Sequence, residues 1–324
     1  MCLDDYRQLA KTLKTPPMFT DVLPMIVKQN EVELLLRLSE KEQSISQLSK
    51  LLGLSQKTLE SKVNSLFVRG FLKKKKDGEI YYSTKPFQSI VNRYLSEGRA
   101  GSLGKYVAAL ATNRMKEHVK HGRADPYPEG KVLPVPEAVL ESVSIILPFE
   151  TAINVLEKAR SFSLRDCECR ITYKNCDKPF RTCLGLDELS DELVERGVAK
   201  KISLEEAKKV LHLANEHGLV HQVLYTDWLK GEVHDLCSCC PCCCLYLRTV
   251  MNYTVKHHIA KSGLVAKVDS EKCNSCGTCI ERCIFNSRKL KNGKSFVVKE
   301  NCYGCGLCTT TCPTGASKLV SASV

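Results

Sequence analysis

Apolar and polar positions alternate between residues 31 and 85 in a way that predicts three helices followed by a β-hairpin. Apolar residues recur every three or four positions in three stretches, at 31–40, 44–53 and 55–70. Ser55 precedes the third stretch and is a favourable N-cap. Residues 71–84 then alternate as two strands that meet at Asp77-Gly78, a dipeptide typical of a type I′ turn.

The middle of the chain alternates between helical and strand patterns. Helices are expected at 148–159, 187–197 and 203–218, and strands at 161–170 and 219–226. Ser203 and Glu206 form a capping box, and Gly218 is a C-terminal stop. This alternation predicts a small α/β or α+β core, although the order of its strands does not follow from the sequence.

The C-terminal part contains an internal repeat. Four cysteines recur 29 positions later with the same spacing, C-x2-C-x2-C-x3-C, and the two runs are Cys273, Cys276, Cys279, Cys283 and Cys302, Cys305, Cys308, Cys312. Matched ligand runs favour two pseudo-symmetric half-sites over eight independent thiols. Residues 287–300 between the runs predict a hairpin with an Asn292-Gly293 turn.

These patterns divide the 324 residues into four segments, and the expected fold class is α+β multidomain. The segments are 1–100, a Gly- and Pro-rich helix and linker at 101–135, a cysteine-rich domain at 136–262, and the repeat at 263–324. No apolar run approaches the ~20 residues of a membrane span, and the N-terminal stretch lacks a signal-peptide core. A cytoplasmic protein is therefore expected, and no membrane partner.

Nineteen cysteines in a reducing compartment favour metal ligands or redox groups over disulfides. The C-terminal repeat, about residues 264 to 320, resembles the bacterial-type ferredoxins that hold two 4Fe-4S clusters. The resemblance implies that the fourth cysteine of each run crosses to the other cluster, giving Cys273, Cys276, Cys279 and Cys312 for one and Cys302, Cys305, Cys308 and Cys283 for the other. Ile284 stands where that family often has proline, whereas Pro313 is in place. Zinc bound by these eight cysteines is the alternative to two 4Fe-4S clusters.

The small residues between the ligands also have a function in this interpretation. A loop must bring three thiolates round one cluster while its N–H groups face the sulfurs. Ser275, Gly277, Gly304 and Gly306 allow this close approach.

The N-terminal order of helix, helix, turn, helix and hairpin resembles the winged-helix domains of transcription regulators. In such domains the third helix enters the major groove and the wing meets phosphates. The resemblance implies a DNA-reading face of Gln56, Lys57, Ser61 and Asn64 and phosphate contacts from Lys73, Lys74, Lys75 and Lys76. The third helix has no arginine before Arg69, however, and arginine is the usual base reader. Dimerisation or protein docking therefore remains an equal alternative.

Ten cysteines lie in the middle segment: Cys167, Cys169, Cys176, Cys183, Cys237, Cys239, Cys240, Cys242, Cys243 and Cys244. Cys237, Cys240 and Cys243 repeat the three-ligand spacing of the C-terminal runs, so we expect one additional cluster with a fourth ligand from the first group. A second site that includes Cys239 and Cys242 is the alternative. Pro241 suits the first turn of a helix, whose N-terminus would favour an anionic cluster.

The chemistry of this middle site stays open between iron–sulfur, which we favour, a structural zinc held by the Cys167 group, and disulfide exchange in a C-x-x-C pair. The segment resembles cysteine-rich domains found with ferredoxin modules in anaerobes, through its C-x-C-R, NCDKP and GLVH elements. That resemblance implies no particular activity. Arg170, next to Cys169, could neutralise cluster charge, bind an anionic substrate or form a surface salt bridge.

Two functions are compatible with these features. The first is an iron–sulfur electron-transfer protein or oxidoreductase component, which passes electrons between the two-cluster module and the cysteine-rich site or a docked redox partner protein. The second is a redox-sensing winged-helix regulator bound to DNA. The net charge is +12, of which residues 263–324 contribute +5, whereas freely diffusing ferredoxins are usually acidic. The sequence leaves the oligomeric state open and is compatible with a homodimer.

Overall fold

The structure is a computed structural model of the chain, and it describes residues 3–97, 99–142, 151–227 and 229–322. The chain divides into two compact units. The N-terminal unit comprises residues 1–115 together with 195–198, and the second unit comprises 116–194 and 199–324. Apart from residues 195–198, the expected segments 136–262 and 263–324 therefore belong to one unit. None of the helices in the described residues combines the length and apolar character that a membrane span needs.

The N-terminal unit is mainly helical. Its elements are α1 (Leu3–Thr12), the 3-10 helix η1 (Pro17–Val22), α2 (Leu23–Ile26), α3 (Gln29–Glu40), β1 (Gln43–Ser44), α4 (Ile45–Leu52), α5 (Gln56–Val68), β2 (Leu72–Asp77), β3 (Glu79–Thr84), α6 (Phe87–Ser96) and η2 (Ala100–Tyr106). The strands form a three-stranded sheet in the order β1-β3-β2. The three helices and the hairpin expected between residues 31 and 85 are all present.

Local capping explains where these helices begin. The Ser55 side chain accepts a hydrogen bond from the Thr58 N–H at the start of α5. Ser44 and Gln47 form a capping box that begins α4. The hairpin turn differs from the expected type I′ turn, because that type needs a positive φ at both central residues and only Gly78 has one (φ 72°).

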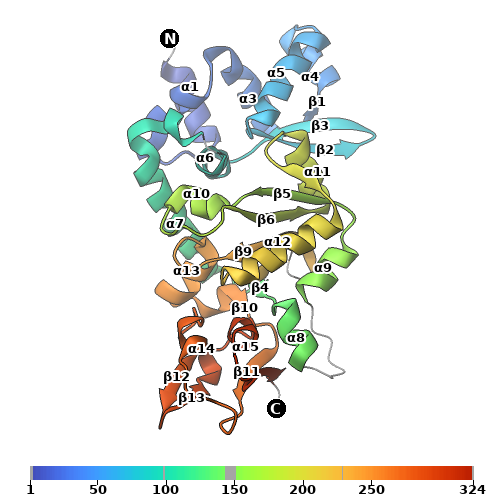
Figure 1. Cartoon of the computed structure of the whole chain (residues 1–324). Helices are drawn as coiled ribbons and strands as arrows, with labels where there is room; N and C mark the ends of the chain where they lie inside the picture. Colours follow the sequence, from blue (N-terminus) through green and yellow to red (C-terminus); the bar gives the residue numbers. More distant parts are fainter. Residues whose placement is uncertain (1–2, 98, 143–150, 228, 323–324) are drawn as a thin grey trace. The chain divides into compact units, whose positions relative to one another are not determined.

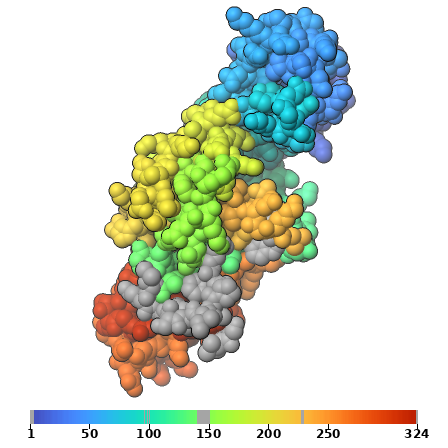
Figure 2. Space-filling view, turned by 90° about the vertical axis from the view of Figure 1, so that its right-hand side faces the viewer, coloured from blue at the N-terminus to red at the C-terminus, as the bar shows by residue number. Residues whose placement is uncertain are grey.

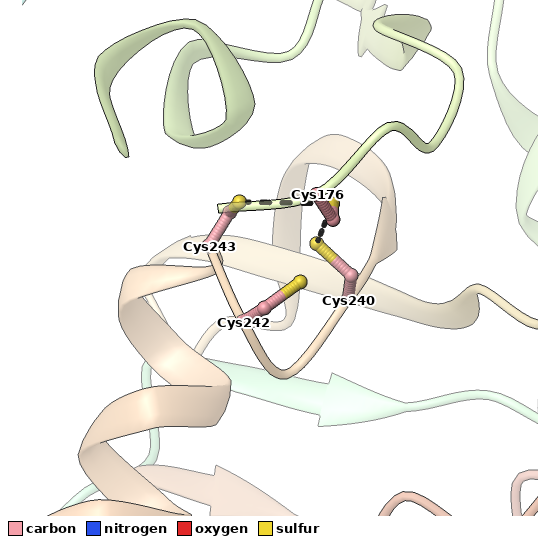
Figure 3. Close-up of side chains that lie close together, drawn as sticks. All are labelled: Cys176, Cys240, Cys242 and Cys243. Carbon is pink, nitrogen blue, oxygen red and sulfur yellow. Dashed lines mark hydrogen bonds between the residues drawn. The ribbon is translucent and has the colours of Figure 1, made fainter. Parts of the chain in front are cut away.

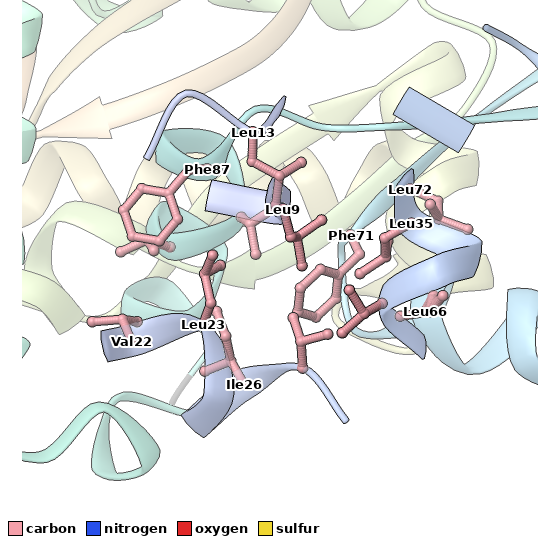
Figure 4. Packing of buried hydrophobic residues seen from close by; sticks show 14 of the residues in the cluster. Leu9, Leu13, Val22, Leu23, Ile26, Leu35, Leu66, Phe71, Leu72 and Phe87 are labelled. Carbon is pink, nitrogen blue, oxygen red and sulfur yellow. The ribbon is translucent and has the colours of Figure 1, made fainter. Parts of the chain in front are cut away.

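The core of this unit is apolar and continuous. Figure 4 shows residues of α1, η1, α2, α3, α5 and α6 packed together, and the Phe19 and Phe87 rings stack at 6.2 Å. An ion pair joins the partly buried Arg69 to the buried Glu31 at 2.6 Å. Residues 195–198 complete the unit, where the fully buried Arg196 side chain pairs with Glu97 at 2.8 Å and donates to the Phe67 carbonyl.

The second unit is built on a seven-stranded sheet in the order β10-β4-β8-β9-β6-β5-β7 (Figure 1). The strands are β4 (Gly130–Val132), β5 (Phe162–Asp166), β6 (Arg181–Leu186), β7 (Lys200–Ile202), β8 (Val220–Asp227), β9 (Glu232–Cys239) and β10 (Ile259–Ala260). All neighbours are antiparallel except β10 and β4. The expected linker at 101–135 is thus partly a strand of this sheet.

Helices of this unit precede or connect the strands. They are α7 (Val107–Ala124), which begins in the N-terminal unit, α8 (Pro136–Ser142), α9 (Ala152–Lys158), α10 (Glu168–Tyr173), α11 (Asp187–Glu195), α12 (Leu204–Glu216), α13 (Leu245–Asn252) and the 3-10 helix η3 (Lys256–His258). Residues 187–216 are at the surface of the face seen in Figure 2, in yellow. The predicted capping box of Ser203 and Glu206 is present, and Gly218 follows α12 with φ 68°. Residues 148–150 of the first predicted helix lie outside the described residues.

The C-terminal segment has two small antiparallel sheets and repeats its local structure. It contains β11 (Leu264–Val268), α14 (Thr278–Glu281), β12 (Arg288–Lys291), β13 (Lys294–Val297), the 3-10 helix η4 (Lys299–Asn301), α15 (Leu307–Thr310) and β14 (Ser317–Ser321). β11 pairs with β14, and β12 with β13. The turn between β12 and β13 has φ 51° at Asn292 and 75° at Gly293, which are the signs that the predicted type I′ turn requires.

Candidate metal centres

Two cavities in the C-terminal segment are each lined by four thiols. One is lined by Cys302, Cys305, Cys308 and Cys283, and the other by Cys273, Cys276, Cys279 and Cys312. The structure therefore brings together the crossed sets that the sequence predicts. The two cavities are related by the 29-residue repeat, since α14 and α15 begin five residues after the first cysteine of each run.

The loops around these cavities contain residues in the left-handed backbone conformation. Ser275, Gly277, Gly304 and Gly306 all have positive φ, between 65° and 81°. A Cβ on Gly304 would lie 2.2 Å from the Ser262 Oγ and 2.3 Å from the Leu264 carbonyl oxygen, so only glycine fits there.

Backbone N–H groups point at the thiols of this cavity. The Ser287 N–H donates to the Cys283 Sγ at 3.3 Å, and the Ala266 N–H to the Cys302 Sγ at 3.4 Å. Such bonds stabilise thiolates and tune the potential of a bound iron–sulfur cluster. The donor set and the shape of the loops fit a 4Fe-4S cluster in each cavity.

The ten middle cysteines form two groups. Cys176, Cys240, Cys242 and Cys243 have Sγ atoms that all lie within 4.8 Å of one another, and we name them the four-thiol site (Figure 3). Cys176 comes from the loop after α10, and the other three come from the turn before α13. Asn175 ties the two segments together, because its N–H donates to the Cys243 Sγ and its side chain to the Cys242 carbonyl.

The sulfur spacing of the four-thiol site indicates the size of its ligand. The Cys176 Sγ lies 3.7 Å from that of Cys240 and 3.8 Å from that of Cys243. Four thiolates bound to one tetrahedral metal ion at about 2.3 Å lie about 3.8 Å apart. The four thiolates of a cubane, each on its own iron, are farther apart, at roughly 6 Å. The four-thiol site therefore has the dimensions for a single metal ion.

The other six cysteines form a closed ring, which we name the six-thiol ring. Each thiol contacts two neighbours in the order Cys167, Cys169, Cys244, Cys239, Cys237, Cys183 and back to Cys167. Five of the six are buried and Cys169 is half-buried. Cys183 comes from β6 and Cys237 and Cys239 from the adjacent strand β9, while Cys167 and Cys244 precede α10 and α13.

This arrangement corrects the expected grouping of Cys237 with Cys240 and Cys243. Residues 237–239 are extended, so the Cys237 and Cys239 side chains point to the same face of β9 and both join the ring. The chain turns after Cys239, which carries Cys240 and Cys243 to the four-thiol site. Pro241 lies in this turn rather than in the helix, which begins at Leu245 with Cys244 as its N-cap. The first group of middle cysteines is also divided, because Cys176 lies in the four-thiol site and Cys167, Cys169 and Cys183 lie in the ring.

The thiol pKa values alternate around the ring. Hydrogen bonds from neighbouring thiols lower the pKa of Cys167 well below its usual value and that of Cys237 to about 7. At Cys244 burial raises the pKa, but the bonds from Cys169 and Cys239 outweigh it and the net shift is downward. The same bonds raise the pKa of the three thiols in between.

Two buried arginines lie against the thiols. The Arg170 guanidinium donates to the Ser238 carbonyl at 3.1 Å, lies 3.9 Å from the Cys240 Sγ and bonds the Thr182 hydroxyl. Arg165 pairs with Asp235 at 2.8 Å beside Cys183 and Cys237. Because Arg170 is 1% exposed, a surface salt bridge is excluded.

Sequence inspection missed two features of this unit. The buried Gln222 side chain on β8 donates to the Cys239 Sγ at 3.2 Å and the Cys244 Sγ at 3.5 Å. His118, Glu129 and His258 bring donor atoms within 4.8 Å of one another, with the two His Nε2 atoms 3.0 Å apart. These residues are far apart in sequence and lack a motif spacing, so no sequence signal marked them.

The nucleic-acid candidates of the N-terminal unit are placed as follows. Gln56, Lys57, Ser61 and Asn64 are exposed on α5. Lys73 and Lys75 lie within 3.8 Å of Glu42, and Lys74 pairs with Glu195. Lys76 on β2 is exposed. Two carboxylates, Glu42 and Glu195, thus lie beside three of the four hairpin lysines.

Comparison with known proteins identifies one part of the chain. Residues 272–317 match the family of the 4Fe-4S dicluster domain. No curated protein and no solved structure matches the chain. The dicluster match, together with the thiol groups, defines an iron–sulfur protein with a further cysteine-rich, metal-binding region at residues 167–244.

Proposed function

We propose that this chain is an iron–sulfur electron-transfer protein in which two 4Fe-4S clusters exchange electrons with a thiolate-bound metal centre in the cysteine-rich region. Cys273, Cys276, Cys279 and Cys312 would hold one cluster, and Cys302, Cys305, Cys308 and Cys283 the other. When bound, the clusters supply one-electron redox chemistry. The chain's own residues position the clusters, shield them from water and offset their charge.

One observation carries the proposal. Cys302 and Cys308 of the C-terminal segment share a single buried core with five cysteines of the six-thiol ring. The rings of Phe285 and Tyr303 stack within this core at 4.4 Å between centroids. A continuous packed core between the two thiol regions brings them close together and supports an internal electron route.

Cationic side chains line the C-terminal cavities. Arg288 is buried, lines both cavities, and donates to the Ser317 hydroxyl at 3.0 Å. The Lys294 ammonium lies beside the cavity of Cys273, Cys276, Cys279 and Cys312 and donates to the Cys273 carbonyl at 2.6 Å. A 4Fe-4S core with four thiolates is anionic, so these cations would stabilise both clusters and favour their reduction.

The direction of flow and the partner are also part of the proposal. A docked redox partner protein in the cytoplasm would exchange electrons with the C-terminal clusters, and the cysteine-rich region would be the internal acceptor, or the active centre if the chain is an oxidoreductase subunit. The basic charge of residues 263–324 suits an acidic partner.

Stopped-flow reduction tests the proposal. The anoxic full chain is mixed with a low-potential donor while absorbance reports each centre. We expect fast bleaching of the 4Fe-4S clusters and then slower reduction of the cysteine-rich centre, and the slow phase should disappear in Cys305→Ala. An unchanged slow phase in that variant would show that the second centre takes electrons directly and that the internal route is absent.

A redox-sensing regulator is the second proposal, supported by the exposed face of α5 and by the adjoining hairpin. It requires salt-dependent binding to duplex DNA that Lys57→Ala weakens and that cluster oxidation abolishes. Lys11→Ala on α1 is the matched control, because Lys11 is also exposed. Equal binding by both variants would mean that α5 does not read DNA.

A further inference from the structure

The six-thiol ring has too many ligands for either of the common thiolate sites. A tetrahedral metal ion binds four thiolates, and a cubane offers one open position on each of four irons. Here six cysteines from four separate elements of the fold meet, because five of them are buried in one core and Cys169 packs against it. Six sulfurs therefore match a core with more than one metal ion, in which thiolates are shared or bound to different metals.

The surroundings of the ring are those of an anionic, buried ligand. Arg170 places a buried guanidinium group beside ring thiols. Gln222, also fully buried, directs one amide nitrogen at two ring sulfurs. A buried cation and a buried N–H donor are costly unless they face negative charge, so these two side chains together indicate thiolates rather than a set of packed neutral thiols.

The ring is also distinct from the four-thiol site. Only Cys176, Cys240, Cys242 and Cys243 form a compact four-sulfur group among the described residues, and none of them belongs to the ring. Arg170 lies between the groups, since it contacts the Cys240 Sγ and is attracted to Cys167, Cys183 and Cys239 of the ring.

We propose that the six-thiol ring binds a polynuclear iron–sulfur core with six cysteine ligands, separate from the single metal ion of the four-thiol site. The choice of iron rests on the proposed function, because the ring shares its buried core with the Cys302 and Cys308 cavity. A core of this kind would be the internal redox partner of the C-terminal clusters.

Metal and sulfide analysis of the full chain, purified without oxygen, tests the proposal. Two cubanes and one ion account for about nine metal atoms per chain, so we expect at least two further irons, with acid-labile sulfide above the eight of two cubanes. A total of about eight or nine, or an excess made up only of zinc, would overturn the proposal. Three disulfides within the ring, found by mass spectrometry under anoxic conditions, would also overturn it.

Matched double variants locate the extra iron. Cys183→Ala with Cys239→Ala should lose at least two irons and their sulfide while the EPR signal of the C-terminal clusters remains, which also shows that the chain is folded. Cys176→Ala with Cys242→Ala should lose at most one metal ion and no sulfide. Equal losses in both pairs would contradict separate sites.

A third variant keeps all six ligands. Gln222→Leu removes the two N–H contacts to Cys239 and Cys244, so the metal content should persist while the reduction potential of the ring's centre falls. An unchanged reduction potential, with the same iron content as wild type, would contradict the placement of the core against Gln222.

The inference and the proposed function can fail separately. Extra iron in the ring together with no electron exchange would leave this inference standing and refute only the proposed electron route.

Discussion

Replacement of Arg170 by methionine tests whether a buried cation stabilises the metal of the four-thiol site. The Arg170 guanidinium lies 3.9 Å from the Cys240 Sγ and is fully buried. Burial raises the Cys240 pKa to about 12, so this thiol is neutral without metal and becomes a thiolate when metal binds. The attraction to Arg170 therefore acts only in the metal-bound state.

Coulomb's law gives the size of the effect. Two unit charges at this distance interact by about 4 kcal/mol at an effective dielectric constant of 20. The bound metal takes up part of the sulfur charge, so we expect about half of this value, ~2 kcal/mol, or roughly a 30-fold loss of metal affinity. The charge-conserving variant Arg170→Lys should recover part of the loss.

Cobalt is a suitable probe, because tetrahedral cobalt thiolate sites absorb strongly. Titration of the full chain with Co2+ against a competing chelator, in wild type and Arg170→Met, yields the affinity ratio. The control is Arg181→Met, since Arg181 is 66% exposed and pairs with Asp166 at the surface, where such pairs contribute about 0–1 kcal/mol. If Arg170→Met bound Co2+ as tightly as the control did, the charge argument would be refuted.

Three further variants test other parts of the structure. Gly304→Ala should lower the free energy of unfolding by about 2–3 kcal/mol and release iron from the Cys302 cavity, because its Cβ would lie 2.3 Å from the Leu264 carbonyl oxygen. In the control Gly315→Ala the new Cβ has nothing within 4 Å, so the loss should be only about 1 kcal/mol, and urea unfolding distinguishes the two. Arg69→Met should destabilise the N-terminal unit by about 2–3 kcal/mol, because it leaves Glu31 buried without its partner. The control Arg7→Met removes an exposed pair and should cost under about 1 kcal/mol, so equal shifts of the melting temperature in the two variants would contradict this. Burial lowers the pKa of His221 from 6.5 to about 4, so the unfolded state binds the extra proton between these pH values. Stability should therefore fall by about 3 kcal/mol as the pH drops from 6.5 to 4. His221→Gln should remove this part of the pH dependence, and a variant with the same acid unfolding profile as wild type would contradict it.

The sequence predicts local features of the fold well. Ser55, the Ser203–Glu206 capping box and the Asn292-Gly293 turn act through neighbours within a few residues, so the pattern is sufficient. The crossed cysteine sets were expected from the resemblance to the two-cluster ferredoxins, and the two cavities are lined by these sets.

The middle site could not be derived in the same way. Its grouping depends on where strand β9 ends, and a change from extended chain to turn after Cys239 reassigns Cys237 to a different set of thiols. Cys176 and Cys183 are seven residues apart but belong to different sites, because β6 carries Cys183 into the sheet next to β9. Pairings between distant strands leave no mark in local spacing, and the same is true of Gln222 and of the His118, Glu129 and His258 group.

The most direct test of the central claim, that the thiols of this chain hold iron that carries electrons, is EPR spectroscopy of the full chain before and after dithionite. The sample must be purified without oxygen, and its iron content measured alongside. We expect a brown protein that gains the signals of two interacting reduced 4Fe-4S clusters per chain. A colourless protein that contains zinc and stays EPR-silent after reduction would contradict it.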